Sequence, residues 1–328
     1  MGNCIPVVSP SGHLTPPRSP SQSPKVLQNG TFVNLLDLLG NFTVSEDYIV
    51  DYAASEPCHN TYCPFFQRAA PAFLASTCVA AALATGALLV ALAKRPHAWP
   101  HHRALVAQLA AATGLFAAVL PAVVAGIGQG WRLGAGACKV TQLLWHCSVF
   151  AQGLLVASGC CSSVWSHWDP RSQRLAVSIW VGALLLALPA ALAGGTVAAP
   201  EVSCIRRNVD VLSPAYLLHL ASCLCVFLLL PAALLVAALV RGGQRAGWGP
   251  AAGASWLFFV LWVPYGVGLA VDFLLHAELL QSTCGIFERF DYALGLCEAL
   301  GVLHCCLGPA VLLAAGLCCR NLGAAGGF

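Results

Sequence analysis

Seven long stretches of the chain contain no Asp, Glu, Lys or Arg. Each stretch has about 20 residues or more, which is the length a helix needs to cross the roughly 30 Å hydrocarbon core of a membrane. We therefore predict seven transmembrane helices, the last of which begins before its uncharged stretch, near Phe287 or Phe290. The stretches cover residues 69–93, 104–127, 140–164, 175–199, 211–240, 251–271 and 299–319.

The composition supports lipid as the solvent of this surface. Hydrophobic residues make up 58% of the chain and charged residues 9%, whereas an ordinary soluble domain has about 25% charged residues. Prolines inside the stretches do not argue against helices, because neighbouring membrane helices satisfy the carbonyls that proline frees. The fold class expected is an all-α membrane protein. The prolines that lie inside the uncharged stretches are Pro121, Pro189, Pro231, Pro264 and Pro309.

The same lack of charge bears on function. Channels and transporters need polar or charged groups along their path, so this alternative is disfavoured. The sequence shows no nucleotide-binding loop, catalytic triad or hydrolytic metal motif. We expect no enzyme activity, no cofactor, no metal site and no nucleic-acid partner; the lipid bilayer is the first partner expected.

Orientation follows from glycosylation motifs and cysteines. The Lys and Arg residues divide about evenly between the two sides, so the positive-inside rule does not decide. Asn29 and Asn41 each begin an N-glycosylation motif, which is modified only in the secretory lumen. Cys58, Cys138, Cys204 and Cys284 all fall on the side of these motifs, where cysteines are oxidised. We predict an extracellular tail over 1–65, a seven-helix bundle over 66–317 and a short cytoplasmic tail over 318–328.

The tail contains an acidic segment. Residues 46–56 carry four acidic and no basic residues, a pattern that attracts and orients basic partners. Tyr48 and Tyr52 each follow an Asp, the local chemistry that tyrosine sulfation favours. The alternative is a solvated acidic tail without a particular partner. The candidate binding residues of the tail are Glu46, Asp47, Tyr48, Asp51 and Tyr52.

Two motifs carry a family resemblance. The seventh stretch contains Glu298 and the run Leu303-His304-Cys305-Cys306-Leu307-Gly308-Pro309, and the sixth contains Trp262-Val263-Pro264-Tyr265. These motifs resemble those of chemokine receptors, a rhodopsin-like seven-helix family, over nearly all of residues 57–317. The resemblance implies basic CC and CXC chemokines as ligands, and the disulfides Cys58–Cys284 and Cys138–Cys204.

The resemblance also implies acidic ligand contacts at the outer mouth of the bundle. Glu298 corresponds to the family's carboxylate that meets the basic N-terminus of the ligand, and Asp291 and Asp272 are further candidates. The alternative for Glu298 is a structural ion pair, for example with Arg289.

The polar groups by which signalling members of the family switch are missing. Thr113 stands where the family has a sodium-binding Asp in the second helix. Ser162, Ser163 and Val164 stand where the third helix has Asp-Arg-Tyr, and Gly308 and Leu312 replace the Asn and Tyr of Asn-Pro-x-x-Tyr. Charged groups in a membrane are costly and therefore functional by default. Their loss predicts a receptor without G-protein coupling.

The expected function is that of an atypical chemokine receptor. Such a receptor binds, internalises, scavenges or transports inflammatory chemokines of more than one class, and moves from the plasma membrane to early and recycling endosomes. The alternatives are a G-protein-signalling receptor with divergent switch motifs and a surface adhesion or pathogen-ligand receptor. The resemblance also allows homo-oligomers or hetero-oligomers with other chemokine receptors.

Overall fold

The computed structural model describes residues 62–94, 102–164, 173–199, 201–205, 213–240, 250–277, 279–280 and 283–325. Within these residues, seven helices are long and apolar enough to cross a membrane, which confirms the predicted number. The chain is therefore a multi-pass membrane protein. The helices are α2 (Cys63–Lys94), α3 (Arg103–Gln129), α4 (Gly134–Val164), α5 (Gln173–Ala193), α6 (Pro214–Leu224), α7 (Leu230–Val240), α8 (Pro250–His276), α9 (Cys284–Val302) and α10 (His304–Ala325).

Two of the spans consist of consecutive helical segments. Helices α6 and α7 are joined by a π-helical segment, η2 (Cys225–Leu229), in which the Leu230 N–H donates to the Cys225 carbonyl. Pro231 follows immediately, and a proline ring clashes with the carbonyl four residues before it. One wider turn before Pro231 relieves this clash and keeps the span continuous. Helices α9 and α10 form the seventh span and meet at Leu303.

The fourth span ends earlier than the sequence predicts. Helix α5 ends at Ala193, and Gly195–Ala199 form strand β1, which pairs antiparallel with β2 (Glu201–Ile205). Gly194 and Gly195 favour the end of the helix because glycine loses more backbone entropy than any other residue when it is placed inside a helix. Thr196 and Val197 are β-branched and suit a strand. The last residues of the predicted 175–199 span therefore belong to a hairpin.

Helix α4 is the centre of the bundle. In the most apolar 18-residue segment of this span 78% of the residues are buried, whereas the corresponding share in the other six spans is 22–39%. It packs against α3, α5 and α8, and its buried face carries polar side chains, among them His146 and Gln152. The outer helices instead expose large apolar side chains such as Leu83, Leu192 and Leu239. Polar side chains inside and apolar side chains outside are the reverse of the distribution in a soluble protein, and they suit a surrounding lipid bilayer.

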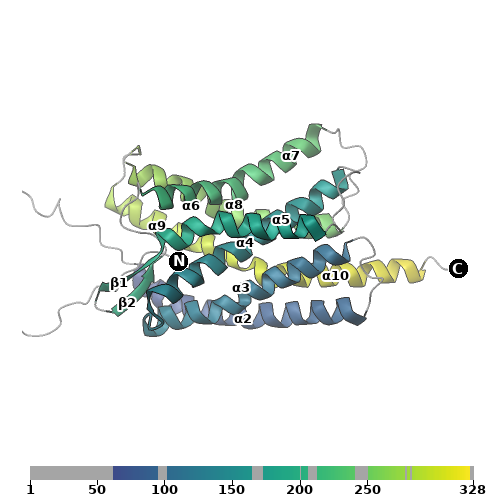
Figure 1. The fold of residues 1–328 in the computed structure, drawn as a ribbon, viewed down its shortest axis with the longest axis horizontal. Helices are drawn as coiled ribbons and strands as arrows, with labels where there is room; N and C mark the ends of the chain where they lie inside the picture. Colours follow the sequence, from purple (N-terminus) through teal and green to yellow (C-terminus); the bar gives the residue numbers. More distant parts are fainter. Residues whose placement is uncertain are drawn as a thin grey trace, which may run out of the picture. The chain divides into compact units, whose positions relative to one another are not determined.

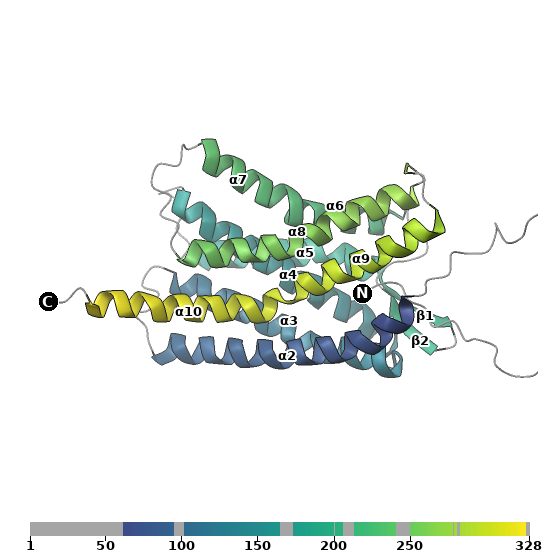
Figure 2. The same cartoon turned by 180° about the vertical axis from the view of Figure 1, so that it is seen from behind.

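The two ends of the bundle differ. Figures 1 and 2 show β1 and β2 at one end, together with the start of α2 and the start of α9. Helix α10 lies beside α2 and ends at the opposite end. It continues to Ala325, so residues 318–325 of the predicted C-terminal tail are helical. The end that carries β1 and β2 is called the disulfide end below.

Candidate functional site

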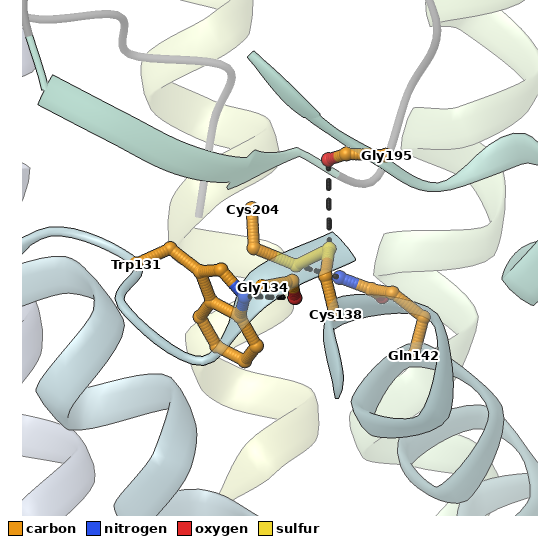
Figure 3. Close-up of a disulfide and its surroundings, with 6 residues drawn as sticks. All are labelled: Trp131, Gly134, Cys138, Gln142, Gly195 and Cys204. Carbon is orange, nitrogen blue, oxygen red and sulfur yellow. Dashed lines mark hydrogen bonds between the residues drawn. A yellow bond between two sulfur atoms is a disulfide. The ribbon is translucent and has the colours of Figure 1, made fainter. Parts of the chain in front are cut away.

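A disulfide between Cys138 and Cys204 ties the hairpin to the central helix. It joins the first turns of α4 to β2, and it is the pairing that the resemblance implied. Figure 3 shows the Gln142 amide beside it, donating to the Cys204 sulfur over 3.7 Å. The Cys138 sulfur lies 3.5 Å from the Gly195 carbonyl oxygen. A disulfide sulfur carries no proton, so this approach is a contact and not a hydrogen bond.

The turn from α3 to α4 sets the position of Cys138. The Trp131 indole N–H donates to the Gly134 carbonyl over 2.8 Å, and the ring is buried. A Cβ on Gly126 would lie 2.6 Å from this ring, so only glycine fits there. Gly134 has φ +79°, which side chains disfavour. The turn thus fixes where α4 begins, and Cys138 follows one turn later.

The start of α2 packs on α9 through aromatic rings. Tyr292 lies 4.6 Å from Tyr62, 5.9 Å from Phe65 and 5.5 Å from Phe66, between ring centroids. Phe66 also lies against Gly295, where an added Cβ would come within 2.7 Å of the ring. The last residues of the predicted tail and the start of α2 are therefore held against α9, the helix that carries Asp291 and Glu298.

The predicted acidic contacts are more enclosed than an open mouth suggests. Glu298 is 4% exposed and Asp272 is 3% exposed, whereas Asp291 is half-buried. Asp291 and Glu298 are seven residues apart on α9, a spacing that places them on one helix face. Nδ1 of His276 lies 2.8 Å from the Asp272 backbone carbonyl oxygen and 3.3 Å from Oδ1 of Asp272. The His276 ring of the same helix therefore lies beside this carboxylate.

The remaining predicted contacts lie outside the described residues. Cys284 is disulfide-bonded, but its predicted partner Cys58 is not described. The predictions for the tail stay predictions for the same reason. They concern Asn29, Asn41, Glu46, Asp47, Tyr48, Asp51 and Tyr52.

Sequence reasoning missed a pair of histidines. His146 of α4 and His219 of α6 meet edge to face with centroids 4.5 Å apart, and His219 lies 3.7 Å from the Cys223 sulfur. The available signal was a histidine in each of two uncharged stretches, since polar groups at membrane depth are costly. Within the described part of the chain, no three His, Cys, Asp or Glu side chains are placed to hold a metal ion.

The positions of the missing switch groups are spread over three helices. The Thr113 hydroxyl lies 2.9 Å from the Leu109 carbonyl and 3.3 Å from Oε1 of Gln152, and it can donate its proton to either. Ser162, Ser163 and Val164 are the last residues of α4, and their side chains are not described. Gly308 and Leu312 of α10 line a cavity together with Thr113.

Comparison with known proteins identifies relatives over most of the chain. No family model matches. Atypical chemokine receptor 1 of Gorilla gorilla gorilla and that of Homo sapiens are each 34% identical over 280 residues, which is 81% of this chain and 79% of the relative. Atypical chemokine receptor 1 of Mus musculus is 30% identical over 285 residues, which is 83% of this chain and 80% of the relative.

Proposed function

Since this chain belongs to the atypical chemokine receptor 1 family, it is a chemokine receptor, and we propose that it binds chemokines without coupling to G proteins. The ligands are basic chemokines of the CC and CXC classes, captured at the cell surface. The receptor internalises, scavenges or transports them through early and recycling endosomes. Its N-terminal tail faces the outside of the cell.

Binding is divided between the tail and the bundle. The acidic tail steers basic ligands by long-range attraction, and its candidate residues are Glu46, Asp47, Tyr48, Asp51 and Tyr52. The aromatic packing of Tyr62 and Phe66 on α9 supports this division, because it ties the end of the tail to the helix of Asp291 and Glu298. A ligand held by the tail would thus have its N-terminus close to these carboxylates.

The proposed absence of G-protein coupling rests on one observation, namely which residues stand at the switch positions. Ser163 stands in place of an arginine, and a short uncharged side chain cannot form the ion pairs by which that arginine acts. The Thr113 hydroxyl is within hydrogen-bond reach of a helix carbonyl and of Gln152. Gly308 brings no side chain at all. None of these positions offers a charge whose pairing could differ between two states.

The proposal is tested in cells that express the receptor and display it at the surface. We expect labelled CC and CXC chemokines to bind, to enter the cells, and to cause no rise in cytosolic calcium. A signalling chemokine receptor expressed at the same level is the positive control for calcium. A calcium rise on chemokine addition would show a signalling receptor with divergent switch motifs. No chemokine binding at normal surface expression would favour an adhesion or pathogen-ligand receptor.

A further inference from the structure

A cavity lies between helices α2, α3, α4, α8 and α10. It offers about 40 Å³ of space for the centres of water molecules. Three polar side chains reach it, namely Thr113 from α3, Gln152 from α4 and His304 from α10, and the rest of its lining includes Phe258 and Leu312. One water needs about 10–15 Å³ of such space, so the cavity has room for about three.

Two nitrogen atoms of this lining lack a protein partner. Nε2 of Gln152 and Nε2 of His304 are buried, and no group among the described residues forms a hydrogen bond with either. Both side chains are 3% exposed. Leaving a buried polar group without a hydrogen bond is costly, so two such atoms at one cavity indicate a polar ligand there.

The surroundings of His304 show what kind of ligand is required. Its Nδ1 lies 3.0 Å from the Trp262 indole N–H and 2.6 Å from the Gly301 carbonyl oxygen. If Nδ1 accepts from Trp262, the neutral ring carries its proton on Nε2, which is then a donor. If Nδ1 donates to Gly301, Nε2 is an acceptor. Water serves in both cases, because it donates and accepts.

A sodium ion, which the family resemblance implies for this region, does not fit the lining. The carboxylate that would balance its charge is replaced by Thr113, and none of the described lining residues is acidic. An unpaired charge in a buried site is strongly unfavourable. The Gln152 amide nitrogen is a donor and cannot ligate a cation.

We propose that this cavity is a water-binding site that excludes sodium. About three water molecules bridge the Gln152 amide to the His304 ring, and so connect the Thr113–Gln152 pair with Trp262. Trp262 is stacked on Phe227 with ring centroids 5.0 Å apart. The water network therefore stabilises the packing of α3, α4, α8 and α10 without an ion.

Thermal unfolding of the purified full chain in nanodiscs tests the exclusion of sodium. We expect the same Tm in sodium chloride and in choline chloride of equal ionic strength. A sodium-specific rise in the Tm of the unmodified protein would overturn the proposal. Thr113→Asp supplies the missing carboxylate, so sodium should raise its Tm by several degrees, while the isosteric neutral control Thr113→Asn shows no response. If sodium does not change the Tm of folded Thr113→Asp, the missing carboxylate is not the reason that the cavity excludes sodium, and the proposal fails.

A high-resolution density map tests the waters directly, even if Thr113→Asp does not fold. We expect peaks at about 2.8–3.0 Å from Nε2 of Gln152 and from Nε2 of His304, as for hydrogen-bonded water. Gln152→Leu should remove the peak at residue 152 and keep the peak at His304. A cavity without density, or a peak at clearly shorter distances surrounded only by oxygen atoms, would contradict the proposal.

Discussion

At the scale of single residues, burial decides what a carboxylate can do. Glu298 and Asp272 are both nearly closed to solvent, and burial of a carboxylate is costly unless it is paired or hydrogen-bonded. Asp272 has Nδ1 of His276 at 3.3 Å, and the His276 ring packs edge to face on Phe287 of α9. The His276 ring therefore helps to hold the end of α8 on α9. Asp291 is half-buried and more open to a ligand.

Substitution of Glu298 tests the division of binding between tail and bundle. We expect Glu298→Ala to weaken chemokine binding only modestly, by about tenfold or ~1.4 kcal/mol, because we propose that most of the affinity comes from the tail. Glu298→Gln keeps the shape and isolates the charge, and should weaken binding similarly. Radioligand competition at matched surface expression measures both. Complete loss of binding with normal surface expression would refute this division.

At the scale of elements, the hairpin β1–β2 depends on its disulfide. The pair Cys138–Cys204 spans 66 residues of sequence and joins β2 to the central helix α4. A long closed loop lowers the entropy of the unfolded chain, so the link should be strongly stabilising. The Gln142 amide on α4 also donates to the Cys204 sulfur, and this contact adds to the link between the hairpin and the bundle.

Removal of this disulfide should destabilise the receptor. For Cys138→Ala with Cys204→Ala we expect a loss of about 4 kcal/mol in the free energy of unfolding, from the loop-closure entropy. Tm and surface expression of the double variant measure the effect. Cys225→Ala is the matched control, because Cys225 is a free, exposed cysteine, and it should change neither quantity. An unchanged Tm in the double variant would show that the hairpin does not need the link.

At the scale of the whole molecule, the distribution of apolar side chains makes this chain a membrane protein. Leu83, Leu192 and Leu239 are exposed on outer helices, while α4 buries polar side chains such as His146 and Gln152. The glycosylation motifs at Asn29 and Asn41 and the cysteines of the disulfide end favour an extracellular N-terminus.

Glycosylation provides the test of orientation. We expect the receptor expressed in mammalian cells to lose apparent mass on treatment with peptide N-glycosidase. Asn29→Gln with Asn41→Gln should reproduce that loss. The control Asn34→Gln, which is not followed by Ser or Thr two residues later, should leave the mass unchanged. If the enzyme does not change the mass of the unmodified receptor, the predicted orientation loses its main support.

Much of the fold was predictable because its main signal is local. A run without charge crosses a membrane whatever its neighbours are, so the number of spans follows from the sequence. The end of α5 was not predictable in this way. Residues 195–199 are uncharged and apolar enough to continue a helix, and their pairing with Glu201–Ile205 depends on contacts across a turn.

The sequence by itself determined the seven spans and the identity of the residues at the switch positions, because both depend only on which residue stands where. Tertiary structure decided which polar groups are buried together. Thr113, Gln152 and His304 come from three different helices, and the enclosure of Asp272 and Glu298 is seen only in the folded chain. Burial and pairing depend on helix packing, which the pattern of one stretch does not contain.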